Sequence, residues 1–223
     1  MKRAHPSTKE RLLRTAERLF ALRGIDAVSM RRICAEADQR NNTALQYHFG
    51  DKQNLIEAIL AERMGANDER RQAMLERIRG DACEDDLHRL VEALVAPFTH
   101  QLFDDDGGRY YVRFSAQLFS RGDAIELLAE QRPWAEAFHT IVDLIRTRLS
   151  HIPEEVIAGR LNLMANQLVH ATAAKEYELT ESGAKLRAKS VERFTADLVD
   201  YMVGGLTAPV TSDAPCVETE PAS

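Results

Sequence analysis

Apolar residues near the start of the chain recur every three or four positions, which is the spacing of a helix with one buried face. The stripe between residues 8 and 23 consists of Leu12, Leu13, Ala16, Leu19 and Phe20. Ser7 and Glu10 have the spacing of a capping box, in which each side chain accepts a hydrogen bond from the other residue's backbone amide. Gly24 supplies the positive φ that commonly ends a helix. We therefore predict a first helix between Ser7 and Gly24.

Two shorter helices follow, separated by a polar turn. Ser29 is positioned to cap the first of them, whose buried edge consists of Met30, Ile33, Cys34 and Ala37. After a turn at residues 38–41, the next helix is capped by Asn41 or Asn42 and runs to Phe49. Two short helices joined by a tight turn are typical of a helix-turn-helix DNA reader.

The remainder of the chain keeps the helical spacing and shows almost no alternation typical of strands. Asp51 caps a fourth helix, whose apolar face begins with Leu55, Ile56, Ile59 and Leu60. No change in composition interrupts this helix, so it links the N-terminal part to the rest. Further helices are expected at residues 87–102, 110–119, 133–149, 153–179 and 182–202, the last one ended by Gly204 and Gly205.

The pattern as a whole predicts an all-α protein with an N-terminal three-helix helix-turn-helix domain and a larger helical domain. We call residues 8–54 the head and residues 55–205 the body. Residues 1–7 and 206–223 are expected to be a disordered N-terminus and a disordered tail, because chain ends that are not packed against a core rarely hold one conformation.

Charge is distributed unevenly between these parts. The chain has a formal net charge of −6, with 44% hydrophobic and 29% charged residues, as in ordinary globular proteins. Residues 1–55 carry 11 Lys and Arg against 6 Asp and Glu, whereas the remainder carries 18 against 29. A basic head on an acidic body suits a protein that meets phosphate at one end only.

The cysteines and the apolar segments bear on the compartment. Cys34, Cys83 and Cys216 are far apart and have neither ligand nor redox spacing, as in a reduced intracellular protein. No apolar segment follows the basic start in the manner of a signal peptide, and no run of about 18 apolar residues occurs. We therefore expect a soluble, cytoplasmic protein without a membrane partner.

The third helix carries the candidate chemistry for DNA. On a helical wheel Leu45 and Phe49 point toward the core of the head, whereas Thr43, Ala44 and Tyr47 point outward. Small methyl groups can meet a thymine methyl in the major groove, and amide side chains can pair with adenine. The alternative is an ordinary helical corner whose polar residues only pack on their neighbours.

Phosphate contacts are expected around this surface. Tyr47 and His48 can donate to phosphate oxygens, Lys52 adds charge at the next helix start, and arginines supply a sequence-independent electrostatic attraction. The predicted DNA-binding residues are Ser29, Arg31, Arg32, Arg40, Asn41, Asn42, Thr43, Ala44, Gln46, Tyr47, His48 and Lys52.

Several motifs within residues 8–60 resemble the DNA-binding domain of the TetR family of transcriptional regulators. The matching stretches are Arg11-Leu-Leu-Arg-Thr-Ala-Glu-Arg-Leu-Phe20, Val28-Ser-Met-Arg-Arg-Ile33 and Tyr47-His-Phe-Gly-Asp-Lys52 followed by Leu55. They occur in the family's order and spacing. The chain departs from the family pattern in its turn, which is one residue longer, and at Gln46, where many members have Tyr.

This resemblance implies that the body is a ligand-binding and dimerisation domain. The last two helices would build a four-helix interface with those of a second copy, so that two heads read a palindrome about one DNA turn apart. The residues expected there include Leu161, Met164, Leu168, Phe194, Leu198, Val199 and Met202. The alternative is that these side chains complete a core within one subunit.

The resemblance also implies a pocket for a small organic effector, apolar or aromatic in character. Such pockets are mostly apolar with a few polar anchors. The candidates are Phe98, Phe103, Tyr111, Phe114, Trp134, Phe138, Gln167 and His170. The alternative is that the aromatic side chains form ordinary core.

Other function classes have weaker support in the sequence. His100 stands near the acidic residues 104–106, but di-metal centres in helical bundles use Glu-x-x-His motifs on two facing helices, and the chain does not provide two. It also has no phosphate-binding glycine loop and no nucleophile elbow. We therefore expect no enzyme, no catalytic residue, no metal and no cofactor.

The expected function is a homodimeric, effector-released repressor that binds double-stranded DNA. The alternative is a DNA-binding regulator whose input is a protein partner.

Overall fold

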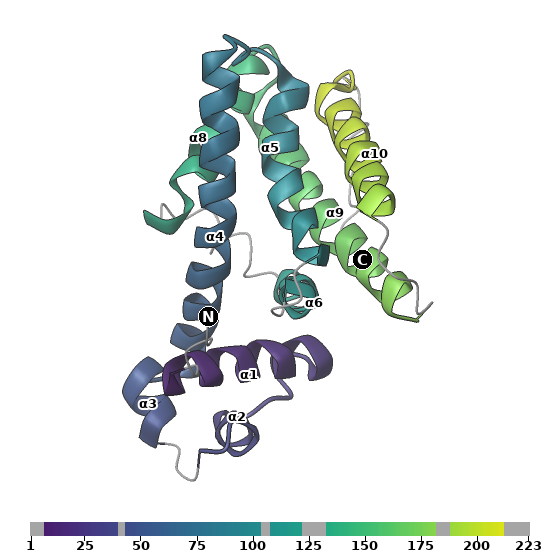
Figure 1. The fold of residues 1–223 in the computed structure, drawn as a ribbon. Helices are drawn as coiled ribbons and strands as arrows, with labels where there is room; N and C mark the ends of the chain where they lie inside the picture. The colour runs from purple at the N-terminus through teal and green to yellow at the C-terminus, as the bar shows by residue number, and fades with distance from the viewer. Residues whose placement is uncertain (1–6, 40–42, 104–107, 122–132, 182–187, 212–223) are drawn as a thin grey trace, which may run out of the picture.

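The computed structural model describes residues 7–39, 43–103, 108–121, 133–181 and 188–211, and every regular element within these ranges is helical. The all-α prediction is confirmed. Figure 1 shows α1, α2 and α3 gathered at one end of an elongated molecule, with α4 rising from them to the far end. The other long helices stand beside the upper part of α4, and α6 lies across the end of this bundle, directly above α1.

The head consists of α1 (Thr8–Arg23), α2 (Met30–Glu36) and α3 (Thr43–Phe49). Its predicted capping interactions are present. The backbone amide of Ser7 donates to Glu10 Oε2 at 2.6 Å, and the amide of Glu10 donates to Ser7 Oγ at 3.2 Å. Ser29 caps α2 through the amide of Arg32. The predicted caps Asn41 and Asn42 lie outside the described residues.

One helix, α4 (Lys52–Gly80), passes from the head into the body. Asp51 caps it by accepting a hydrogen bond from the amide of Asn54, as predicted. Gly50 adopts a φ of 75°, which a residue with a side chain rarely does, so the sharp turn between α3 and α4 depends on this glycine. The expected boundary between residues 54 and 55 therefore falls inside a continuous helix.

The described body comprises α5 (Leu87–Thr99), η1 (His100–Phe103), α6 (Gly108–Phe119), η2 (Pro133–Ala135), α8 (Glu136–Arg148), α9 (Glu154–Glu181) and α10 (Ala188–Thr207). The predicted helix at 133–149 is divided, because Pro133 begins a short 3-10 segment before the α-helix starts at Glu136. Residues 182–187, where the last helix was expected to begin, lie outside the described residues.

The predicted end of the last helix at Gly204 and Gly205 is wrong, because α10 continues to Thr207. Leu206 is buried, which anchors the final turn. Arg160 of α9 donates to the carbonyl oxygen of Leu206 at 2.7 Å and so satisfies a carbonyl that the helix end leaves unpaired. A contact between distant residues thus outweighs the weak helix propensity of glycine.

Two apolar clusters fill the molecule. The first begins in the head, with residues such as Leu12 and Phe20, and continues through α4 and α6 to Val169 of α9. The second joins the far part of α4 to α5, α8, α9 and α10. The seven residues expected at a subunit interface, including Leu161 and Met202, belong to or pack against this second cluster. Five of the seven are buried within one subunit, whereas Leu168 and Phe194 are half-buried.

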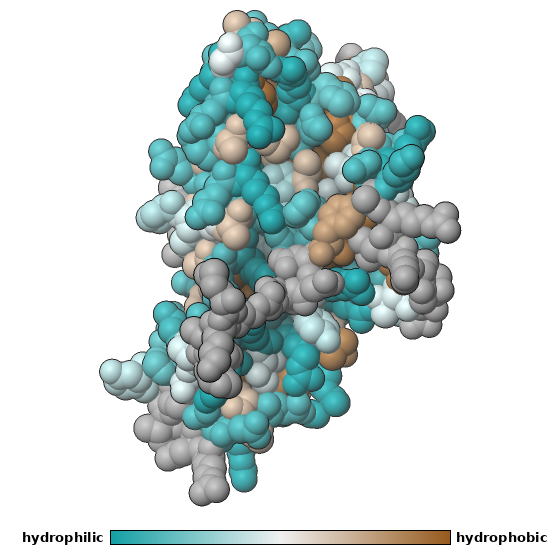
Figure 2. Space-filling view, viewed as in Figure 1, coloured by the Kyte–Doolittle hydropathy of each residue, from teal (hydrophilic) through white to brown (hydrophobic). Residues whose placement is uncertain are grey.

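The outer surface is mainly hydrophilic in the view of Figure 2, with apolar patches along the seam between α5 and α10. Among the described helices, none has both the length and the apolar character needed to cross a bilayer.

Candidate functional site

The outward face of α3 is the most exposed part of the head that carries predicted DNA-binding side chains. Leu45 and Phe49 are buried and hold α3 against the rest of the head. Gln46, Tyr47 and His48 are exposed, and the Tyr47 side chain is 84% accessible. The Tyr47 ring centroid lies 5.3 Å from that of His48, and the exposed side chain is accessible to a partner molecule.

The predicted residues around α3 differ in how freely they face solvent. Ser29 and Arg31 are exposed, whereas Arg32 is half-buried and lies 3.8 Å from Glu36. Arg18 of α1 also pairs with Glu36, at 2.9 Å, and so ties α1 to α2. For Thr43 and Ala44 the structure describes only the helical backbone in the first turn of α3. Arg40, like Asn41 and Asn42, lies outside the described residues.

Lys52 is less available to a ligand than its sequence position suggests. It is half-buried at the start of α4, with its Nζ 5.8 Å from the centre of the Phe20 ring. Burial lowers the pKa of Lys52, and nearby Asp26 raises it. The side chain therefore contributes both to packing between α1 and α4 and to the positive charge of the head.

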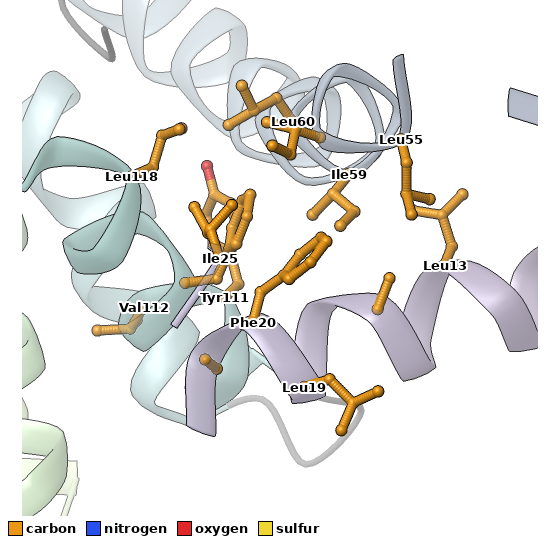
Figure 3. Packing of buried hydrophobic residues seen from close by; sticks show 14 of the residues in the cluster. Leu13, Leu19, Phe20, Ile25, Leu55, Ile59, Leu60, Tyr111, Val112 and Leu118 are labelled. Atoms are coloured by element: carbon orange, nitrogen blue, oxygen red, sulfur yellow. The ribbon is translucent and has the colours of Figure 1, made fainter. Parts of the chain in front are cut away.

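The head joins the body through a packed aromatic contact (Figure 3). Phe20 points from α1 toward Ile59 of α4, with Tyr111 of α6 beside it. The rings of Phe20 and Phe114 stack with centroids 6.0 Å apart. Phe20 and Phe114 are both fully buried. A shift of α6 would therefore either displace α1 or open a cavity between the two helices.

An ion pair is buried at the same junction. Both Nε and Nη2 of Arg63, on α4, donate to Glu17 Oε2, on α1, at 3.1 Å, and the Glu17 side chain is only 4% exposed. Burial raises the pKa of Glu17 to about 7, which outweighs the opposite effect of Arg63; Glu62 raises this pKa further and Arg14 lowers it. The connection between head and body therefore contains a carboxyl group that titrates near neutral pH.

This titration predicts a pH-dependent stability. Because the folded-state pKa of Glu17 lies above its ordinary value of 4.5, its contribution is fully present below pH 4.5 and is lost as the pH rises through about 7. The loss should reach about 3 kcal/mol by pH ~8. We expect Glu17→Gln to remove this component, so that urea unfolding from pH ~4.5 to ~8 gives a smaller decline than in the wild type. Parallel stability curves for the two proteins would contradict the assignment.

Four of the predicted effector-binding aromatic residues come together inside the body. Phe98 and Tyr111 have ring centroids 5.8 Å apart, and Tyr111 and Phe114 are 6.4 Å apart. Phe138 joins them through Arg71, whose guanidinium carbon lies 5.4 Å from the Phe138 ring centre and which interacts electrostatically with Tyr111. These side chains extend from α5, α6 and α8 toward α4.

The other two aromatic candidates lie at separate hollows. Phe103 lines a hollow of about 290 Å³ between α5 and α10. Trp134 lines a hollow of about 570 Å³ between α4 and the start of α8. Both side chains are half-buried and pack against the first apolar cluster.

The predicted polar anchors Gln167 and His170 are not with the aromatic group, which corrects the sequence-based assignment. Both are exposed on α9. They follow Leu163 at helical intervals of four and seven residues and so share its outward face, whereas Leu161 and Met164 face the core.

The polar residues that do lie inside the body were missed in the sequence. Asn67, Asp68 and Arg71 of α4 and Gln101 of η1 are buried. The three residues on α4 have a sequence signal, because they continue the buried stripe of this helix between Met64 and Leu75. A helical pattern that counts only apolar residues does not detect these buried polar positions. Within the described ranges, no three His, Cys, Asp or Glu side chains are arranged to hold a metal ion.

Two family models match the chain. The model for bacterial regulatory proteins of the tetR family matches residues 12–59, and the model for a tetracyclin repressor-like C-terminal domain matches residues 92–205. No curated protein matches the chain significantly.

Several solved structures are similar at low sequence identity. The multidrug binding protein EbrR, complexed with imidazole, is 17% identical, with 94% of this chain and 100% of that chain covered and a TM-score of 0.44. A putative TetR-family transcriptional regulator from Mesorhizobium loti is 16% identical, with coverages of 88% and 95% and a TM-score of 0.43. A putative tetR family transcription regulator from Shewanella sp. PV-4 is 18% identical, with coverages of 87% and 96% and a TM-score of 0.47.

Proposed function

The chain belongs to the TetR family of transcriptional regulators, and from this premise we propose that it is a homodimeric repressor of a palindromic operator, released by a small organic effector. The exposed face of α3 is the observation that carries the proposal. Gln46, Tyr47 and His48 stand outward from a head that is basic, while the rest of the chain is acidic. This combination favours the head over the rest of the surface as the site that contacts DNA.

We assign residues 8–54 to DNA binding and residues 55–205 to regulation. Within the head, Gln46 is the candidate for base contact, and Tyr47, His48 and Arg31 are candidates for phosphate contact. The remaining predicted positions surround these side chains or form the turn before α3. Arg32 is a weaker candidate, because its pairing with Glu36 already occupies part of its charge.

A second copy of the chain is the proposed occupant of the outer face of α9 and α10. Three large side chains are well exposed there: Leu163 at 71%, Tyr177 at 59% and Tyr201 at 66%. Exposed apolar and aromatic side chains on two neighbouring helices are typical of a subunit interface. Gln167 and His170 share the Leu163 face and are proposed to belong to this interface.

Selection from random double-stranded DNA, followed by binding titrations at two salt concentrations, tests the proposal. We expect a palindrome whose half-sites lie about one helical turn, or roughly 34 Å, apart. Affinity should fall steeply with salt, because bound arginines and lysines release counterions from DNA. Weak binding without sequence preference would contradict the assignment of the head.

Tyr47→Ala should weaken binding to the selected operator while leaving the fold intact, because the Tyr47 side chain is exposed. A loss of about 1 kcal/mol per subunit doubles in a dimer, which corresponds to roughly 30-fold in affinity. Tyr110→Ala provides a matched control, since Tyr110 is an exposed tyrosine on α6, outside the head. Equal operator affinity for the two variants would show that α3 does not read DNA as proposed.

A further inference from the structure

The interior of the body contains hydrogen-bonding groups that the described residues do not satisfy. Asn67, Asp68 and Arg71 lie on one face of α4 at helical intervals of one and four residues, and Gln101 reaches this face from η1. All four side chains are buried. Buried polar groups normally have partners, because leaving water without a new hydrogen bond is costly.

The carboxylate of Asp68 caps the start of α8. The backbone amide of Ala137 donates to Asp68 Oδ2 at 2.8 Å, and the amide of Phe138 donates to Oδ1 at 2.9 Å. Both amides belong to the first turn of α8, where a negative charge also interacts favourably with the helix dipole. The carboxylate therefore has a partner set of its own without Arg71.

Arg71 has a carboxylate nearby, but two of its donor atoms are unpaired among the described residues. Its residue is 5% exposed, and its Nη1 lies 3.7 Å from Asp68 Oδ1, beyond hydrogen-bond distance. Nε and Nη1 are buried and have no hydrogen-bond partner among the residues that the structure describes. Burial lowers the pKa of Arg71, but an arginine starts so far above neutral that the guanidinium stays charged.

Gln101 is a second buried residue with an unsatisfied polar atom. Its Nε2 donates to Asn67 Oδ1 at 2.7 Å, whereas its Oε1 is buried without a partner in the described part of the chain. Asn67 is one helical turn from Arg71, so Gln101 contacts α4 one turn away from the guanidinium. Burial raises the pKa of Tyr111 to about 12, which keeps its hydroxyl protonated.

The surroundings of these groups are aromatic. Phe138 covers the guanidinium of Arg71, and Phe98 and Phe114 flank Tyr111. Unpaired guanidinium donors in apolar surroundings favour a molecule with an anionic acceptor group on an apolar body. Because Asp68 already lies 3.7 Å from Arg71, a phosphate ester would bring more negative charge than the site compensates.

We infer that Arg71 is the polar anchor of the effector site and that the effector is an organic monocarboxylic acid. Its carboxylate accepts hydrogen bonds from Arg71, and its apolar part lies against the Phe138 side of the aromatic group. A hydroxyl group on the acid can donate to Gln101 Oε1. This inference rests on the proposed release of the repressor by a small molecule, and it names the chemical class of that molecule.

Binding of acids and matched amides to the full-length protein tests the inference. The probes are benzoate and octanoate, which distinguish aromatic from aliphatic bodies, each compared with benzamide or octanamide by calorimetry and thermal unfolding. We expect at least one acid to bind about 10- to 100-fold more tightly than its amide, because a charge-assisted hydrogen bond is lost in the amide. Equal binding of each acid and its amide, or no binding of either acid, would overturn the inference.

Arg71→Met provides the residue-specific test. Methionine keeps an unbranched apolar stem but removes the charge and the donors, so the preference for the acid should disappear. Arg70→Met is the matched control, because Arg70 is the exposed neighbour on α4 and should leave the preference unchanged. Arg71→Lys keeps a charge without the guanidinium donors and should retain part of the preference. An acid preference that survives in Arg71→Met would exclude Arg71 as the anchor.

The unliganded variants separate a ligand role from a structural one. Since Asp68 keeps the amides of Ala137 and Phe138 as partners, Arg71→Met should fold and bind the operator normally, with a moderate loss of stability from the broken ion pair. A large loss of stability in Arg71→Met would instead show that Arg71 serves the fold, and wild-type binding of acids over amides would then remain the deciding measurement.

Operator release separates this inference from the proposed function. If acids bind through Arg71 but leave operator affinity unchanged, the anchor stands and release by this effector fails. If only neutral molecules release the operator, the acid class fails and the repressor function stands.

Discussion

Phe20→Ala should lower the free energy of unfolding by about 3–5 kcal/mol, the usual cost of removing a buried phenylalanine. Phe20 is fully buried, stacks on Phe114 of α6 and lies beneath the Lys52 ammonium group. The cavity would open where α1, α4 and α6 meet, so packing is lost on both sides of the junction between head and body. Urea unfolding, followed by circular dichroism at 222 nm, measures the effect.

Leu22→Ala on the same helix is the matched control for Phe20→Ala. Leu22 is exposed, so its truncation should change the free energy of unfolding by less than about 0.5 kcal/mol. If Phe20→Ala were as mild as Leu22→Ala, the packed junction between α1 and α6 would be refuted. If Phe20→Ala melted in two steps, it would show that the head had separated from the body.

Asp68→Ala should cost a similar amount, about 3–5 kcal/mol, through electrostatics instead of packing. The substitution leaves the amides of Ala137 and Phe138 without their acceptor and removes the nearest carboxylate from Arg71. Three buried groups thus lose a partner at once, so the first turn of α8 should fray. Amide hydrogen exchange in α8, together with urea unfolding, measures both consequences.

Two variants calibrate the Asp68 effect. Asp68→Asn keeps one oxygen acceptor and should lose about 1–3 kcal/mol, less than the alanine variant. Glu69→Ala removes the neighbouring carboxylate, which is exposed, and should be close to neutral. An Asp68→Ala protein with unchanged exchange in α8 would mean that the capping of this helix by α4 is unimportant.

The head was predictable from sequence because its helix ends depend on local chemistry. Ser7, Ser29 and Asp51 each accept a hydrogen bond from an amide three residues ahead, so the spacing alone reveals the cap. The apolar stripe of α1 is regular, and its buried side is the predicted one.

The body was predictable in outline, but its interior was not. The end of α10 depends on Arg160, which lies far away in the sequence, so no local pattern could show it. Gln167 and His170 are polar residues of the kind that line pockets, but the buried Leu161 and Met164 fix the inward face of α9 and leave both outside it. Arg71 was overlooked because a charged residue in a helix is normally solvated, and only the packing of α8 on α4 buries it.

The apolar contact between α1 and α6 also limits the design of chimeras in which the head of this chain is joined to another body. A chimera made by cutting after residue 54 would separate Phe20 from Phe114, although these rings stack in the intact protein. The transplanted head would then meet a foreign α6, with either a clash or a void where the rings had matched. The head and the body of this chain are therefore not independently exchangeable. Because α1 and α6 pack against each other, a stable chimera has to take both helices from the same parent.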